Sequence, residues 1–502
     1  MNKIALIISF AAFIFLFSCT DVDENVYDKY SAVEFYASPE GADAALASVY
    51  AKIPGNWDGK GYAGADNGWY DLNCMSTDEQ VVPHRNTGDW QLDFARLYLR
   101  QWLPSDFILG QTWTWLYESV FQANLAVEQL KVANADPSKI AEAKVLRAFF
   151  YYLLMDDYGN IPFFTENNLS VDQIPQVDRS VVFDFVVSEL KENIELLTST
   201  KGGIYYGRFN KWAGYALLAK IYLNAEVYVG TPMWTECIEV CDKLSGGGFK
   251  LHSGEADAAN VLGSKYYELF GDVCPDDETI LAIYTTVDVV GRNIFTIRSL
   301  GGTDGTLLTG YGAWNGTIVP QEYVEKFDDN DVRKRQFRYG ADPYGPKPAG
   351  FINYSLEIDN FDNPGADRNA GARNIKFWPA EPMNSGGASN DFPIYRYADI
   401  LLMKAECLLR TGNASDAKPL VDQVRERSGL DALAANPTLE NVYNERGFEL
   451  TWEGHRRQDM IRFGKFTESH GLAPAVDSHF ELFPIPTSAL NANPNLTQNP
   501  GF

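Results

Sequence analysis

Apolar residues recur at helical spacing along most of the chain. A first segment follows Ser38-Pro39-Glu40, where a serine that can cap a helix precedes a proline suited to the first turn. The same periodicity predicts further helices over roughly 110–133, 138–156, 180–198, 209–226, 232–245, 394–411, 414–428 and 438–463. Short connectors join many of these segments, which is typical of antiparallel helix pairs.

Small residues recur where two of these helices would approach each other. Ala405, Leu408, Gly412 and Ala417 follow the small-large-small spacing of a tetratricopeptide repeat. The full consensus of that repeat is absent, and generic helix packing also produces such spacing. The pattern therefore predicts degenerate helix pairs and not a regular array.

Three long stretches interrupt the helical pattern. They cover 55–109, 246–319 and 338–390 and are rich in Gly, Asn, Asp, Pro or Trp, with short β-like runs such as Ile280-Leu-Ala-Ile-Tyr284. Loops of this length within a compact domain are usually functional. We therefore expect a mostly α fold, a tetratricopeptide-like helical scaffold with long loop-rich excursions and little β structure.

The N-terminus has the layout of a secretory signal. A positive start is followed by the apolar run Ile4–Phe17, which is shorter than the roughly 20 residues that a spanning helix needs. Leu16-Phe17-Ser18-Cys19 resembles the lipobox of bacterial lipoproteins, although Phe17 is bulkier than usual. We expect cleavage after residue 18 and lipidation of Cys19, which would hold the protein on a membrane. An ordinary signal peptide is the alternative.

Charge and cysteine content narrow the function. The net charge of −25 argues against nucleic acid or an anionic membrane surface as partner. Besides Cys19 there are five cysteines, an odd number that argues against a disulfide scaffold. Cys237 and Cys241 could share a metal, but no nearby ligand completes the set, so packed thiols are favoured. No cofactor is predicted. Asp328-Asp-Asn-Asp331 lacks the glycine and glutamate of a calcium loop, and structural calcium elsewhere stays open.

Several blocks together resemble the SusD/RagB family of outer-membrane nutrient-binding lipoproteins. The blocks are Arg147-Ala-Phe-Phe-Tyr-Tyr-Leu-Leu154 with Asp157-Tyr-Gly-Asn-Ile-Pro162, Tyr395-Arg-Tyr-Ala-Asp-Ile-Leu-Leu-Met-Lys-Ala-Glu406, Glu445-Arg-Gly-Phe-Glu-Leu-Thr-Trp-Glu-Gly-His-Arg-Arg-Gln-Asp459, and the ending from Pro484-Ile-Pro486 to Gln498-Asn-Pro-Gly-Phe502. The resemblance implies a tetratricopeptide-like superhelix that carries a loop-rich binding portion. It also implies a partner, a SusC-like TonB-dependent transporter to which glycans, or in some branches peptides, are delivered.

The resemblance and the composition together suggest a division of the chain. We expect a signal peptide over 1–18, a lipidated linker over 19–37, an N-terminal helical region over 38–245 with a binding loop over 55–109, a loop-rich binding region over 246–390 and a C-terminal helical region over 391–502. The acidic residues after Cys19 resemble the surface-export signal of some Gram-negative lipoproteins, with a solvated linker as the alternative. The expected location is the outer face of the outer membrane.

A sugar site needs flat aromatic side chains and hydrogen-bonding groups at their edges. The non-helical stretches offer Trp57, Trp69, Tyr70, Trp90, Trp102, Tyr311, Trp314 and Trp378, whereas Trp113, Trp115, Trp212, Trp234 and Trp452 lie in predicted helices and are expected in the core. The resemblance favours two segments, 77–90 and 310–316. By it we nominate as ligand-binding residues Arg85, Trp90, Trp102, Tyr311, Trp314 and Asn315. For each aromatic residue, packing in the core or anchoring of a loop is the competing interpretation.

One carboxylate cluster invites a catalytic interpretation. Glu445, Glu449 and Glu453 are spaced i,i+4, but residues on one helix face do not flank a glycosidic bond from opposite sides. We expect a structural charge network, with Glu453 paired to Arg457 and with other arginines nearby, and likewise an acid partner for Arg147. No hydrolase motif is present. The chain is expected to be a binding protein and not an enzyme; a peptide binder, a surface hydrolase and a ligand-free lid are the alternatives.

Overall fold

The computed structural model describes residues 32–55, 60–64, 66–85, 90–358 and 367–502. The predicted signal peptide, Cys19 and Trp57 lie outside these residues. The fold is mostly helical, as predicted. Its helices are α2 (Ala32–Ala37), α3 (Pro39–Tyr50), α4 (Trp69–Met75), α5 (Leu92–Leu99), α6 (Phe107–Val132), α7 (Pro137–Tyr158), α8 (Arg179–Asn193), α9 (Lys211–Leu223), α10 (Ala225–Val229), α11 (Trp234–Leu244), α12 (Phe295–Ser299), α13 (Gly302–Thr309), α14 (Gln321–Val324), α15 (Tyr397–Arg410), α16 (Ala414–Arg427), α17 (Leu439–Glu449), α18 (Arg456–Arg462) and α19 (Thr487–Ala492).

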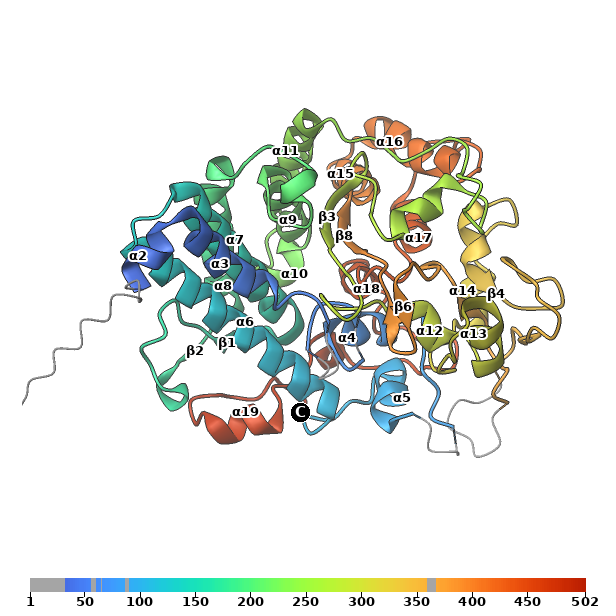
Figure 1. The fold of residues 1–502 in the computed structure, drawn as a ribbon, viewed down its shortest axis with the longest axis horizontal. Helices are drawn as coiled ribbons and strands as arrows, with labels where there is room; N and C mark the ends of the chain where they lie inside the picture. The colour runs from blue at the N-terminus through green and yellow to red at the C-terminus, as the bar shows by residue number, and fades with distance from the viewer. Residues whose placement is uncertain (1–31, 56–59, 65, 86–89, 359–366) are drawn as a thin grey trace, which may run out of the picture.

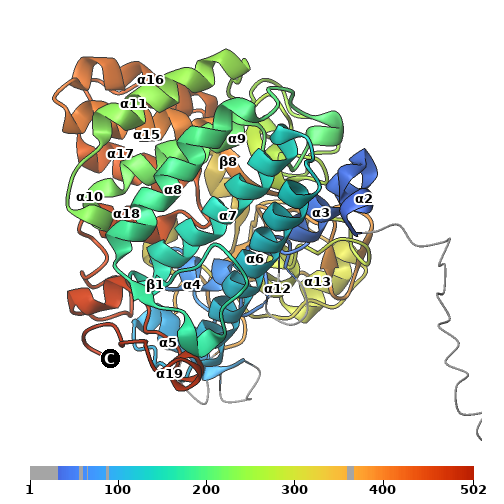
Figure 2. The ribbon, with the colours of Figure 1, turned by 90° about the vertical axis from the view of Figure 1, so that its left-hand side faces the viewer.

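The long helices form one continuous row. α6 packs on α7, α7 on α8, α9 on α11, α11 on α15 and α15 on α16. Figure 2 shows this row side by side, from α6 to α16. Ala405, Leu408 and Ala417 lie in one buried cluster between α15 and α16, and Gly412 has a φ of +86° in the turn between them. The predicted tetratricopeptide-like pairing is confirmed there.

Local signals set the ends of these helices. Asp136 caps α7 by accepting a hydrogen bond from the Ser138 amide, and Pro137 occupies the first turn. Gly159, with a φ of +72°, ends the same helix. Between these ends every residue from Val145 to Tyr158 is buried, so α7 is a central element of the core.

The strands are short and pair antiparallel. β3 (Thr279–Ile283), the predicted β-like run, pairs with β8 (Phe392–Arg396). The others are two-residue pairs: β1 (Ile161–Pro162) with β2 (Gln176–Val177), β4 (Phe337–Arg338) with β5 (Arg373–Asn374), and β6 (Met383–Asn384) with β7 (Gly387–Ala388). Figure 1 shows β4 and β6 among loops beside α12 and α13.

Two predictions about helices need correction. The helix predicted over 438–463 is two helices, because Trp452 and Gly454 adopt φ values of +61° and +82° between α17 and α18. The stretch 55–109, predicted as loop, contains α4 and α5. Both are short. Every residue of α4 is buried, so this helix shows no amphipathic period, whereas α5 does bury one face, through Phe94, Ala95, Leu97 and Tyr98.

The described cysteines are packed thiols, as expected, and the C-terminus is bound to the body of the fold. Cys74, Cys237, Cys241, Cys274 and Cys407 are free and buried. Asn499 donates hydrogen bonds to the carbonyls of Tyr158 and Phe483, which fastens the C-terminal segment to the body. Across the described residues, no helix combines the length and apolar character needed to span a membrane.

Candidate functional site

A β-bridge joins the two segments nominated from the sequence. Val81 and Ile318 exchange both backbone hydrogen bonds, with N···O distances of 3.0 and 2.9 Å. Val319 makes a second bridge, to Ala372. Because of this pairing, the segment that ends at Arg85 and resumes at Trp90 lies against the segment 310–318.

Trp90 rests on the backbone of the second segment. Its indole covers Gly316 so closely that a Cβ added there would stand 2.7 Å from Cε2 of the ring. The ring packs edge-on against Phe94 with 5.8 Å between centroids, and His84 donates through Nδ1 to the Trp90 carbonyl at 2.6 Å. Trp90 remains half-buried, so part of it faces solvent.

Arg85 and Asn315 hold the loop from beneath. The Arg85 guanidinium donates to the Asn315 carbonyl at 2.7 Å, and Oδ1 of Asn315 accepts from Arg373 at 2.8 Å. Asn315 has a φ of +56°, a conformation that Asn tolerates better than most residues. Burial lowers the pKa of Arg373 to about 10. Since Arg85 and Asn315 are 2% and 8% exposed, both position the loop in this structure.

Trp314 and Tyr311 lie at the outer edge of the same loop. Trp314 is half-buried beside Ile297, Met383 and Ala388, and its Nε1 donates to the Ser385 carbonyl at 3.1 Å. Its own amide donates to the Ile297 carbonyl at 2.9 Å, which ties the loop to α12. Tyr311 follows α13 and is 38% exposed. The structure therefore brings together five of the six nominated residues.

Trp102 lies apart from this group. It is 2% exposed and packs among Phe483, Phe480 and Phe466, with ring centroids 4.8, 5.3 and 6.5 Å away. No face of its indole is open to a ligand in this structure, because these rings surround it. The competing interpretation, packing in the core, accounts for its surroundings.

The other aromatic candidates are also either buried in the core or half-buried at its edge. Trp69 and Tyr70 belong to α4 and are 2% and 0% exposed, so the expectation that they lie in an open loop is wrong. Trp378 is half-buried against the core. Arg373 and Gly316 shape the site but were not nominated. The glycine-rich run 310–316 hinted at a close approach at Gly316, whereas nothing in the sequence marked Arg373.

The glutamate cluster is a buried ion network. Glu445, Glu449 and Glu453 are at most 2% exposed. Arg396 reaches Glu449 at 2.8 Å and Glu453 at 2.7 Å. The remaining pairs join Arg333 to Glu445 and Glu449, Arg425 to Glu445, Arg427 to Glu449, Lys376 to Glu453, and Arg396 to Glu278. Burial alone would raise the pKa of Glu449, but Arg427, Arg396 and Arg333 lower it below its usual value.

The buried network confirms the predicted structural role of the three glutamates. The partner predicted for Glu453, however, differs from the ones observed. The predicted Glu453–Arg457 pair is wrong, because Glu453 lies before α18 and the positive φ of Gly454 interrupts the helix between the two residues. Arg457 instead donates to the Glu481 carbonyl at 2.6 Å and lies over the ring of Phe483. Arg147 does pair with an acid, Glu189, at 2.6 Å. Among the described side chains, no group of three or more His, Cys, Asp or Glu is arranged to hold a metal ion.

Two family profiles match this chain, one in its N-terminal half and one in its C-terminal half. A profile of the SusD family matches residues 353–475. A second profile, described as starch-binding and associating with the outer membrane, matches residues 60–223. The two segments together take in more than half of the chain. The chain belongs to the SusD/RagB family.

Full-length relatives agree with this assignment. The starch-binding protein SusD of Bacteroides thetaiotaomicron is 25% identical over 526 residues, which span 90% of this chain and 89% of the relative. SusD-like protein P25 of Formosa agariphila is 25% identical over 553 residues, 99% of this chain and 98% of the relative.

Solved structures share the fold. Surface glycan-binding protein A from Bacteroides thetaiotaomicron has a TM-score of 0.71 at 21% identity, covering 93% of this chain and 100% of that chain. The same protein in complex with laminarihexaose has a TM-score of 0.68 at 21% identity, with 92% and 99% covered. A laminarin-binding SusD-like protein has a TM-score of 0.72 at 23% identity, with 92% and 99% covered. At these identities the likeness establishes the fold of this SusD/RagB protein.

Proposed function

We propose that this protein is a cell-surface lipoprotein that binds an oligosaccharide or polysaccharide without chemical change and delivers it to a SusC-like TonB-dependent transporter. The observation that carries the proposal is the convergence of Trp90, Tyr311 and Trp314 on one loop system, fixed by the Val81–Ile318 bridge. These side chains keep aromatic surface at the solvent boundary, while buried Arg85 and Asn315 hold their backbone.

Aromatic faces suit sugars for a physical reason. A pyranose ring presents a flat C–H face that packs on an indole or phenol, and its hydroxyl groups bond to polar groups at the edge. Polar neighbours are present beside Trp314, where Asn384 donates to the Asp288 carboxylate at 3.0 Å in an exposed position. Related proteins that bind starch and laminarin have this same fold, which supports a glycan as the ligand class.

Two observations support the location at the outer membrane. Leu16-Phe17-Ser18-Cys19 has the spacing of a lipobox at the expected distance from the start. One of the two matching families is described as associating with the outer membrane. A lipid anchor at Cys19 would leave the helical body described above free to meet a transporter in the same membrane.

The ion network supports binding without catalysis. A glycosidase needs one carboxyl as acid and another as base or nucleophile on opposite sides of the scissile bond. Here Glu445, Glu449 and Glu453 are buried and engaged by arginine and lysine, so a substrate could reach none of them without opening the core.

Affinity electrophoresis against a polysaccharide panel, with a peptide library as a control, tests the proposal. We expect one or more polysaccharides to retard the wild-type protein. Trp314→Ala and Trp90→Ala should weaken binding by about 1–3 kcal/mol while the melting temperature stays near that of the wild type. Wild-type affinity in both variants, with folding intact, would remove these residues from the site.

The same experiment separates the alternatives. Retention by peptides and by no polysaccharide would assign the scaffold to peptide binding. Release of reducing sugar from a bound polysaccharide by purified protein would indicate a hydrolase. If no ligand binds and the protein co-purifies with a transporter, the remaining assignment is a structural lid on that transporter.

A further inference from the structure

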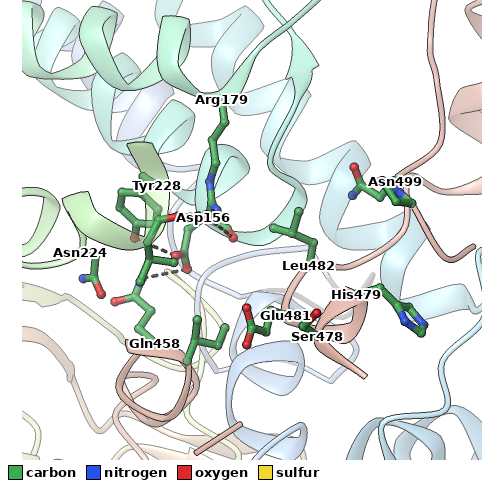
Figure 3. A pocket seen from close by; sticks show the side chains of 13 residues that line it. Asp156, Arg179, Asn224, Tyr228, Gln458, Ser478, His479, Glu481, Leu482 and Asn499 are labelled. Atoms are coloured by element: carbon green, nitrogen blue, oxygen red, sulfur yellow. Dashed lines mark hydrogen bonds between the residues drawn. The ribbon is translucent and has the colours of Figure 1, made fainter. Parts of the chain in front are cut away.

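A second hollow lies far along the chain from the aromatic loops. It has a volume of about 330 Å³ and opens between the end of α7, the start of α8, α10, α18 and the C-terminal segment. Figure 3 shows Arg179 reaching into it from above and Glu481 from below, with Gln458 and Asn499 on either side. Its volume is at the lower end for ligand pockets, which matches a ligand of one or two rings.

Two buried amides present oxygens without donors. Nε2 of Gln458 donates to the Tyr152 hydroxyl at 2.6 Å and to Asp156 at 2.8 Å, so its orientation is fixed. Nδ2 of Asn499 is fixed in the same way by two carbonyls. Gln458 and Asn499 are only 4% and 6% exposed, yet nothing in the described part of the chain donates to Oε1 of Gln458 or Oδ1 of Asn499. Both residues line the hollow, so a ligand that carries hydrogen-bond donors could bond to both oxygens there.

Glu481 adds a third acceptor. Its carboxylate is half-buried and receives no hydrogen bond from any described residue. Burial raises the pKa of Glu481, although the positive charges of Arg457 and Arg179 oppose this shift. A donor placed between Glu481 and Gln458 would satisfy both groups.

Arg179 supplies donors on the opposite wall. Its guanidinium donates to the carbonyls of Met155 at 3.0 Å, Asp156 at 3.1 Å and Val227 at 3.4 Å, and it stacks over the Tyr228 ring at 4.6 Å. These bonds use three of its five N–H groups. No carboxylate among the described residues forms an ion pair with it, so its charge and its remaining N–H groups are available toward the hollow.

We propose that this hollow binds one neutral, hydroxyl-rich ring: a single sugar residue, either free or at the end of a chain. A hydroxyl group both donates and accepts, so a ring of hydroxyls satisfies Gln458, Asn499 and Glu481 and also takes hydrogen bonds from Arg179. The positive charge of Arg179 would repel a cationic ligand, and the negative charge of Glu481 would repel an anionic one, so a neutral ligand fits best. Val227, Ile461 and Leu482 offer apolar surface for the C–H face.

This site deepens the proposed function and rests on it for the class of ligand. It shares no residue with the aromatic site, which is built from His84, Arg85, Trp90 and residues 310–318. The two can therefore be removed separately, and a long glycan would gain from two contacts on one protein.

Saturation-transfer NMR with the purified protein tests the inference. The probes are glucose, galactose, mannose and N-acetylglucosamine, each alone, together with oligosaccharides that end in the same residues. The variants are Glu481→Ala, which removes an acceptor, and Ser478→Trp, which fills the hollow from an exposed position on its rim. Glu255→Ala, which removes an exposed carboxylate elsewhere, is the control, and Trp314→Ala reports separately on the aromatic site.

We expect at least one monosaccharide or chain end to bind the wild type and Glu255→Ala with the same affinity. Its Kd should rise about tenfold or more in Glu481→Ala and in Ser478→Trp, as for the loss of a hydrogen bond to a charged group. Binding of free sugars supports a monosaccharide site, and binding of oligosaccharides alone supports a chain-end site.

Other outcomes would overturn the inference. One is that the sugar signals are the same in Glu481→Ala and Ser478→Trp as in the wild type. Another is that methylammonium or inorganic phosphate binds in the hollow and sugars do not. The proposed function fails separately, when no polysaccharide retards the wild-type protein. Polysaccharide binding that depends on Trp314, without any sugar signal that depends on Glu481, would refute only the second site.

Discussion

Gly316 allows the aromatic site to be tested without removing an aromatic side chain. A Cβ at this position would stand 2.7 Å from Cε2 of Trp90 and closer still to Cζ2, whereas ordinary contacts of a Cβ begin at 3.4 Å. In Gly316→Ala the half-buried indole must therefore move outward by roughly 1 Å, a shift large enough to disturb binding geometry. If Trp90 stacks on the glycan, we expect a loss of about 1–3 kcal/mol, or roughly 5- to 150-fold in affinity.

Gly312→Ala is the matched control for this change. It lies in the same loop, and a Cβ added there meets nothing within 4 Å. Isothermal titration calorimetry with a polysaccharide that retards the wild type would give both affinities, and thermal melting would show that both variants fold. Equal affinities for Gly316→Ala and Gly312→Ala, with intact folding, would refute the role of Trp90 as a platform.

Three further predictions concern buried groups. Arg396→Met leaves Glu449 and Glu453 with less positive charge, so the free energy of unfolding at pH 7 should fall by about 3–5 kcal/mol in chemical denaturation. Because the folded-state pKa values of these two carboxyls are lowered, the difference from the wild type should shrink as the pH falls below about 4. Trp102→Phe should lower the melting temperature and leave glycan affinity unchanged, since Trp102 packs among aromatic rings of the core; reduced affinity in a folded variant would contradict this. Burial raises the pKa of Asp391 to about 7, so the stability contributed by its protonated form is lost as the pH rises from about 4 through 7. The melting temperature of Asp391→Asn minus that of the wild type should therefore increase from pH 5 to pH 8. A difference that stays the same across this range would contradict the raised pKa of Asp391.

Helical periodicity predicted the scaffold because most of its helices bury one face. α6, α8, α9, α11, α15 and α16 all lie where the spacing of apolar residues placed them. The pattern failed at Trp452 and Gly454, where positive φ values interrupt the helix predicted over 438–463. It failed again at α4, where every residue is buried and no polar face marks the helix. In both cases tertiary packing, and not the local period, decides the backbone.

The aromatic site was predictable in composition but not in geometry. Trp90 and Trp314 were nominated from aromatic residues in loops and from family resemblance. Their proximity depends on the Val81–Ile318 bridge, a single pair of backbone hydrogen bonds between distant segments, which no periodicity reveals. Trp102 was indistinguishable from them in sequence, because what separates it is the group of phenylalanines contributed by residues 466–483.

The division of labour within the molecule explains how one fold can serve different ligands. The charged interior fixes the scaffold: Arg333, Arg396 and Lys376 neutralise carboxylates from distant segments, and a substitution there leaves a buried charge. The aromatic loops are held mainly through backbone atoms, as in the hydrogen bonds of Trp314 to Ile297 and of Arg85 to the Asn315 carbonyl. Exposed side chains on such a backbone, Tyr311 above all, can change without cost to the core. If the aromatic loops bind the ligand as proposed, recognition can diverge while the scaffold stays constant among proteins that share this fold at 20–23% identity.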